Sequence, residues 1–174
     1  MAHRSTIGLA GLLVVGTAML LGGFGMHRQP DGTSERDAVL RANSAFFEAL
    51  NAMFTGDARP LEDVYWHTDD VVYMGADGAY NVGWRPTYEN WKRQAALRIG
   101  GSISPSNIEV TIVGDVAMTN QIISGTNTVD HELVEVKLRS TSVLQRKDGT
   151  WKLIGHHVDV IPKLHTGKRA TPTK

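Results

Sequence analysis

The feature that most constrains the fold is a series of strand-like runs in the second half of the chain. Ile108, Val110 and Ile112 alternate with polar residues, which is the period of a half-buried β-strand. A Gly-Asp turn follows, and further runs of this kind cover 116–129, 132–146 and 151–161. A Lys-Asp-Gly turn precedes the last of these runs. Because successive strands joined by short turns pair antiparallel, this half predicts a long antiparallel meander.

The first half of the chain has a helical period instead. Apolar residues recur at helical spacing between residues 35 and 54, and a short second helix carries Pro60 in its first turn, where proline is tolerated. Two short strand-like runs after Asp69 predict a hairpin, and a third helix with an aromatic face covers residues 85–98. The predicted order is therefore three helices, interleaved with a hairpin, followed by the meander.

This order of elements predicts the α+β class. A meander of this kind has one apolar face, and the helices are the only partners available to cover it. A strongly curved antiparallel sheet wrapped over three N-terminal helices makes a cone-shaped barrel, and the open end of such a cone is a pocket. A chain of 174 residues is long enough for one domain of this size with a proper core.

The N-terminal segment predicts export or membrane attachment. Arg4 precedes twenty uncharged residues, Ile7 to Met26, which is the pattern of a signal peptide. The same run is long enough to span a bilayer if it is not cleaved, so the sequence leaves both alternatives open. We therefore expect an export signal or membrane anchor at 1–30, the folded domain at 31–162 and a disordered basic tail at 163–174. The expected location is periplasmic, extracellular or at the membrane.

The composition excludes several classes of protein. The absence of cysteine excludes disulfides, thiolate metal sites and a cysteine nucleophile. Lys plus Arg equals Asp plus Glu at 18 each, which argues against a nucleic-acid partner. The sequence also lacks the G-x-S-x-G nucleophile elbow, a P-loop and a dinucleotide-binding glycine motif in the domain. We therefore expect no cofactor.

Two stretches of the sequence are similar to a known family. They are FFEALNAMFTGDARPLEDVYWHTDDVVYMGADGAYNVGWRPTYENW, at 46–91, and DGTWKLIGHHVD, at 148–159. Together they resemble the SnoaL-like branch of the nuclear-transport-factor-2-like superfamily over about residues 35–161. The resemblance implies a ketosteroid isomerase-like or polyketide cyclase-like cone fold, usually a homodimer packed through its sheet. It implies no single activity, because the superfamily includes isomerases, cyclases, dehydratases, epoxide hydrolases and members that only bind or dimerise.

The last strand carries the strongest site candidates. Strict alternation places Leu153, His157 and Asp159 on one face and His156 on the other. Adjacent histidines on a regular strand point apart, so we predict no metal site there and interpret His156 as scaffold. His157 and Asp159 are close enough for the carboxylate to orient the imidazole, and the resemblance implies that their face lines the pocket. We predict them as a catalytic pair, the alternative being a hydrogen-bonded pair at a strand end or a dimer interface.

Further candidates for contact with a bound molecule lie earlier in the chain. They are His67, Asp70, Tyr73, Trp84, Tyr88 and Trp91. The alternative interpretations are a loop histidine, a turn aspartate and core aromatics. Arg139 is a candidate as well: pointing inward it would bind a carboxylate or enolate oxygen, and pointing outward it would be a sheet-surface or dimer contact. The pattern of its strand leaves its direction open.

We expect a domain that binds a small, largely apolar molecule in a conical pocket. The alternative is a cofactor-free isomerase, cyclase or dehydratase. In that alternative His157 moves a proton, Asp159 orients it, and Tyr73 or Arg139 stabilises a developing oxyanion. A purely structural dimer module is the third possibility. The sequence does not identify the ligand or the reaction.

Overall fold

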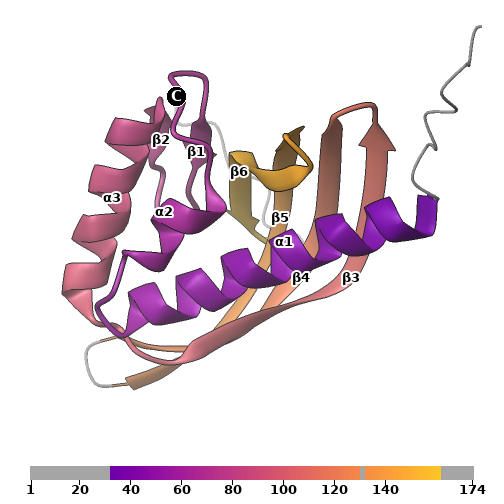
Figure 1. The fold of residues 1–174 in the computed structure, drawn as a ribbon. Helices are drawn as coiled ribbons and strands as arrows, with labels where there is room; N and C mark the ends of the chain where they lie inside the picture. Colours follow the sequence, from indigo (N-terminus) through magenta and orange to yellow (C-terminus); the bar gives the residue numbers. More distant parts are fainter. Residues whose placement is uncertain (1–31, 130–131, 162–174) are drawn as a thin grey trace, which may run out of the picture.

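The computed structural model describes residues 32–129 and 132–161, which form a curved sheet with helices on one side (Figure 1). The helices are α1 (Gly32–Phe54), α2 (Pro60–Val64) and α3 (Trp84–Leu97). The strands are β1 (Val72–Met74), β2 (Tyr80–Val82), β3 (Ser102–Val113), β4 (Val116–Val129), β5 (Glu132–Lys147) and β6 (Thr150–Val160). The predicted order of elements and the α+β class are confirmed. The predicted N-terminal segment and the basic tail lie outside the described residues.

Helix α1 lies across the sheet and supplies much of the core. Val39, Phe46, Leu50 and Met53 recur at intervals of seven, four and three residues, and each is at most 5% exposed. This spacing places them on one side of the helix, which packs against the strands (Figure 1). The helix begins at Gly32, three residues before the predicted start.

The sheet has six strands in the order β2-β1-β6-β5-β4-β3. The hairpin and the meander are antiparallel, as predicted. Strand β1 also pairs with β6 in parallel, with Tyr73 opposite His156, and this pairing was not predicted. It joins the hairpin to the last strand of the meander, so residues more than 80 positions apart in sequence lie side by side.

The two faces of the meander have opposite character. On β4, the alternate residues Ala117, Thr119, Gln121 and Ile123 are buried toward α1. Met118, between two of them, is 38% exposed on the outer face. We call the face toward α1 the inner face and the other the outer face.

Two irregularities bend the sheet. In β3 the register shifts between Ser106 and Glu109, so that one extra residue is accommodated opposite β4. Asn107 takes the left-handed conformation there, with φ at 53°, which asparagine tolerates better than most residues. A second irregularity lies in β6. Extra residues of this kind increase the local bend and twist of a strand, which curves the sheet around α1.

A cluster of polar side chains fixes the start of α1 to the far end of the meander. Arg146 on β5 forms ion pairs with Glu35 of α1 and with Asp115 in the β3–β4 turn. The indole of Trp151 donates a hydrogen bond to the second oxygen of Glu35 at 3.1 Å. Helices α2 and α3 lie at the other end of α1 (Figure 1), so that α1 is held at both ends across the inner face.

No helix among the described residues is long and apolar enough to cross a membrane.

Candidate functional site

One extra residue in β6 decides which histidine faces the interior. Val143 of β5 pairs with Gly155, but the next residue, Leu144, pairs with Leu153, so Ile154 has no partner. Beyond this bulge the inward and outward positions exchange. His156 is 3% exposed on the inner face, whereas His157 lies exposed on the outer face. The prediction that Leu153 and His157 share a face is therefore wrong.

His156 lies in an aromatic part of the interior. Its ring centroid is 4.7 Å from that of Phe46 and 6.3 Å from that of Tyr73, whose ring is nearly parallel to it. Its Nδ1 is 3.0 Å from the hydroxyl oxygen of Ser142 on the neighbouring strand. Burial, and then the charge of His157, lower the pKa of His156 to about 3, so the ring is neutral at pH 7.

The second ring nitrogen of His156, Nε2, makes no hydrogen bond among the described residues. Within the described part of the chain the ring makes its hydrogen bond through Nδ1. If Ser142 donates to Nδ1, then Nε2 carries the proton and is a donor; if Nδ1 donates to Ser142, then Nε2 is an acceptor. Nε2 is thus able to take either role toward a bound molecule.

Buried polar side chains continue from Ser142 across the sheet, because Thr119 of β4 pairs with Ser142. We call this set, together with His156, the polar floor. Asn43 of α1 donates to the amide oxygen of Gln121 at 2.9 Å, and its own oxygen accepts from Gln121 at 3.2 Å. The hydroxyl of Thr119 donates to the same Asn43 oxygen at 3.1 Å. All three side chains are buried on the inner face. They satisfy one another, and so this part of the floor is fixed.

Some buried polar atoms have no hydrogen-bond partner among the described residues. They are the hydroxyls of Tyr65 and Ser140, the indole nitrogen of Trp91 and the amide nitrogens of Asn81, Asn90 and Gln94. The side chains of Tyr65, Trp91 and Ser140 are at most 5% exposed. An unpaired buried polar group costs free energy, so each such atom requires an explanation.

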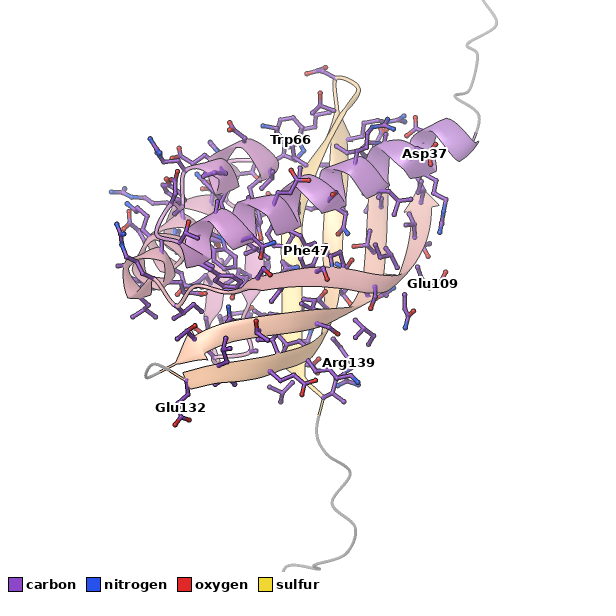
Figure 2. The ribbon with its side chains drawn as sticks, turned by 90° about the horizontal axis from the view of Figure 1, so that it is seen from below. Asp37, Phe47, Trp66, Glu109, Glu132 and Arg139 are labelled. Atoms are coloured by element: carbon purple, nitrogen blue, oxygen red, sulfur yellow. The ribbon has the colours of Figure 1, made fainter. Side chains whose placement is uncertain are left out.

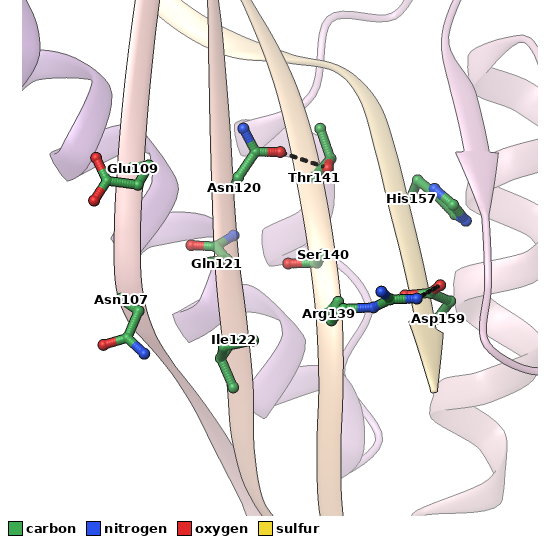
Figure 3. A pocket seen from close by; sticks show the side chains of 10 residues that line it. All are labelled: Asn107, Glu109, Asn120, Gln121, Ile122, Arg139, Ser140, Thr141, His157 and Asp159. Carbon is green, nitrogen blue, oxygen red and sulfur yellow. Dashed lines mark hydrogen bonds and ion pairs between the residues drawn. The ribbon is translucent and has the colours of Figure 1, made fainter. Parts of the chain in front are cut away.

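The outer face carries a shallow groove of about 510 Å³ at its bend (Figure 3). Three of the predicted site residues line it together: Arg139, His157 and Asp159. Other residues that line it are Asn107, Glu109, Asn120, Ile122 and Thr141, and also Gln121 and Ser140, whose side chains are buried on the inner face beneath it. His157 and Asp159 share a face, as predicted, but this face is opposite α1 and outside the cone.

Asp159 is bound to Arg139 in this groove. The guanidinium donates to both carboxylate oxygens, at 2.6 and 3.2 Å, and this pairing lowers the pKa of Asp159 (Figure 3). The direction of Arg139, which the sequence left open, is therefore outward (Figure 2). Since the carboxylate is held by Arg139, it forms no hydrogen bond with the imidazole of His157 among the described residues.

The remaining predicted residues form two groups. His67, Trp84 and Tyr88 stack in series beside α2, with centroid distances of 4.4 and 5.0 Å. Glu62 fixes this stack, because its side chain accepts from the Tyr88 hydroxyl and its carbonyl oxygen contacts His67 Nε2. The hairpin β1–β2 separates these residues in sequence, since Glu62 lies on α2, His67 between α2 and β1, and Trp84 and Tyr88 on α3.

Tyr73 and Trp91 lie in the interior instead. Their ring centroids are 4.2 Å apart, and Tyr73 faces His156 across the β1–β6 pairing. Burial raises the pKa of Tyr73 to about 12. Asp70 is separate from both groups: it is exposed and accepts a hydrogen bond from the Thr68 hydroxyl, which lowers its pKa. Its surroundings are those of a turn residue.

No group of three or more His, Asp or Glu side chains within 32–129 and 132–161 is placed to hold a metal ion.

The sequence model of the SnoaL-like domain matches residues 39–161. The chain belongs to the SnoaL-like domain family. No curated protein matches the sequence significantly.

Solved structures show the same fold as this SnoaL-like domain. A candidate dehydratase of the NTF2-like family from Streptomyces avermitilis is 21% identical, with a TM-score of 0.66 over 75% of this chain and 98% of that chain. A candidate aromatic ring hydroxylase from Novosphingobium aromaticivorans is 21% identical, with a TM-score of 0.63 over 78% and 94%. A candidate ketosteroid isomerase from Shewanella frigidimarina is 21% identical, with a TM-score of 0.57 over 70% and 94%.

Several interior residues of this SnoaL-like domain were not among the predicted site residues. They are Asn43, Tyr65, Thr119, Gln121, Ser140, Ser142 and His156. One signal was present in the sequence: polar residues at alternate positions of β4 and β5, at 119, 121, 140 and 142, where an apolar face was expected. The place of His156 had no such signal, because the bulge at Ile154 reverses the alternation.

The buried His156 predicts a specific pH dependence of stability. Between its ordinary pKa of 6.5 and its folded pKa of about 3, the unfolded chain binds a proton that the folded chain does not. The free energy of unfolding should therefore fall as the pH is lowered through this range, with about 2 kcal/mol lost from this residue between pH 7.5 and 5. Urea unfolding followed by circular dichroism at several pH values measures this free energy of unfolding.

The matched control is the neighbouring histidine. His156→Gln should flatten the pH dependence, whereas His157→Gln, on the exposed side of the same strand, should leave it close to that of the wild type. Equal slopes for the wild type and His156→Gln would contradict a neutral buried ring.

Proposed function

We propose that this SnoaL-like domain binds a small, largely apolar molecule in the interior of its cone, against the polar floor around His156. The observation that carries the proposal is the set of unpartnered polar atoms of Tyr65, Trp91 and Ser140 in an interior of aromatic and uncharged polar side chains. A domain that needed only a stable core would be more stable with apolar residues at these positions. A ligand that approached these atoms would compensate for their burial.

The surrounding side chains support an apolar ligand. Rings of Phe46, Tyr65, Tyr73 and Trp91 lie in one continuous series of contacts with His156. Pockets for small molecules are typically apolar with a few convergent polar groups, and this interior has that composition. The similar structures described as a dehydratase, a hydroxylase and a ketosteroid isomerase are in keeping with a small organic ligand, although at this identity they establish the fold alone.

The alternative function is cofactor-free acid–base catalysis, and one observation favours it. The groove of the outer face brings together His157, Asp159 and Arg139, the residues predicted for that chemistry. Against it, Asp159 is paired with Arg139, and the groove is open to solvent rather than enclosed. Enclosure strengthens the electrostatic interactions that such catalysis needs. Binding in the interior is therefore the function that the geometry supports best.

Binding inside the cone is testable with an uncharged fluorescent probe, N-phenyl-1-naphthylamine. We expect saturable binding with increased fluorescence, because the probe leaves water for an apolar interior. Ser140→Leu adds volume on the inner face beside the floor and should weaken binding at least tenfold. Fluorescence titration of the full chain measures the affinity, and circular dichroism verifies the fold.

The neighbouring residue provides the control. Thr141→Leu makes a similar change on the outer face and should leave the affinity within about twofold, since adjacent strand residues point to opposite faces. An equal loss of affinity in both variants, or a loss of affinity in Thr141→Leu alone, would place the probe outside the cone and refute the proposal.

We further propose that two copies of the chain pair through the outer face. Met118 is 38% exposed there, and Ile122 lines the groove beside Arg139. Ile122→Glu should therefore shift the chain from dimer to monomer in sedimentation velocity, because a carboxylate would be buried against its symmetry copy. Leu97→Glu, on α3 and away from the sheet, should leave the dimer intact. A wild-type chain that sediments as a monomer at micromolar concentration would refute this pairing.

Export or membrane tethering is also a proposal, supported by Arg4 and the apolar run from Ile7 to Met26. Fractionation of cells that produce the full chain should find it outside the cytoplasm. Replacement of Leu12 and Leu13 by Arg should retain it inside, because charges interrupt the apolar run.

A further inference from the structure

Strand β5 has an open edge over its first residues. The strand pairs with β6 only as far as Leu138, because Val160, the residue opposite, is the last of β6. Residues 132–137 of β5 pair with β4 on one side, and no strand among the described residues pairs with them on the other. Figure 2 shows this stretch, which begins at the labelled Glu132, at the border of the sheet. The backbone N–H and C=O groups along such a border are able to pair with a further strand.

Apolar side chains are exposed along this open edge. Leu133 is 75% exposed and Val134 is 44% exposed. An exposed edge strand with apolar side chains readily pairs with another chain, and native proteins commonly cover such an edge. We therefore asked which segment would cover residues 132–137.

We propose that the chain's own C-terminal segment, residues 161–166, covers the open edge of β5 as a continuation of β6. The place where the described chain ends supports this occupant, because Val160 lies opposite Leu138, directly beside the first open residue of β5. Residues 162–174 follow, so the chain is long enough to reach the end of the edge. No other segment begins at this point of the described structure.

The register of the existing β5–β6 pairing makes this proposal specific. Continued by one residue of the tail for each residue of β5, it places Lys163 opposite Glu135 and Leu164 opposite Val134. Residues directly opposite each other in antiparallel strands interact, and both an opposite-charge pair and an apolar pair stabilise the sheet. Charge and hydropathy are therefore complementary in the one register that the structure already uses.

The two faces of the sheet agree with the same register. Val134 belongs to the alternate set of β5 that includes Val136 and Leu138, which pack against the core. Leu164 would therefore point to the inner side, whereas Lys163 would lie on the outer side in water. Proline occurs on edge strands, and the added strand would be one, so Pro162 is compatible with it. The pairing would order the first residues of the tail, 163–174, for which the sequence predicted disorder.

The absence of cysteine from the chain allows a direct test by disulfide formation. In the full chain, Lys163→Cys combined with Glu135→Cys should form a disulfide under mild oxidation, because Cα atoms opposite each other in antiparallel strands are about 4.5 to 5.5 Å apart. The matched control combines the same tail cysteine with Leu133→Cys, on the same face of β5 but two residues away. It should form a disulfide at least about tenfold more slowly, because diagonal neighbours are too far apart for an unstrained disulfide. Mass spectrometry of digested samples measures both rates.

Hydrogen exchange tests the pairing without cysteines. Lys163→Glu would place two carboxylates opposite each other and should accelerate exchange of the amides of residues 133–137 at least about twofold. Adding Glu135→Lys exchanges the two charges and should restore the slower exchange. Lys168→Glu makes the same change outside the proposed strand and should leave the exchange of these amides as it is in the wild type. Hydrogen exchange of the full chain, followed by mass spectrometry, measures all four proteins.

Three results would overturn the proposal. Equal rates of disulfide formation with Glu135→Cys and Leu133→Cys would show that the tail reaches the edge without a register. A disulfide that joins two chains would assign the open edge to a second copy instead. Exchange of residues 133–137 that is unchanged in Lys163→Glu would show that no strand covers them. None of these results concerns binding inside the cone, which the titration with N-phenyl-1-naphthylamine tests separately.

Discussion

The packing of α1 across the curved sheet is the interaction on which the rest of the structure depends. The inner face of the meander combines apolar and uncharged polar side chains, and α1 covers it with Val39, Phe46, Leu50 and Met53. The helix also brings Asn43 to the sheet, where it pairs with Gln121 and Thr119. One helix therefore supplies both the apolar core and part of the polar floor. Because a helix crossing a curved sheet cannot fill its whole concave side, α2 and α3 are needed to cover the remainder.

The bulge at Ile154 has the largest consequence for function. With regular alternation His157 would face α1 and His156 would be in solvent. The single unpaired residue reverses this, and the two histidines acquire opposite properties: His156 is neutral and enclosed by rings, whereas His157 is exposed beside an ion pair. Bulges occur next to binding sites in other proteins because they redirect a side chain without changing the fold.

The two faces of the sheet are chemically distinct. The inner face combines rings, amides and hydroxyls and has no formal charge among the described buried residues. The outer face carries the Arg139–Asp159 pair, Glu109 and His157. Burial imposes this division, because an ion in the interior would lack water and a counter-charge. The ligand proposed for the interior and the second copy proposed for the outer face would meet these two different surfaces.

The sequence by itself determined the elements, their order and the α+β class, because these follow from local periods and turn residues such as the Lys-Asp-Gly turn before β6. It also determined that His157 and Asp159 share a face, since they are two residues apart. Only the tertiary structure decided which face that is, because one bulged residue exchanges inside and outside and leaves no local signal at Ile154. The partners of His156 were decided in the same way. Ser142, Phe46 and Tyr73 come from β5, α1 and β1, and only the closing of the sheet over the helix brings them together.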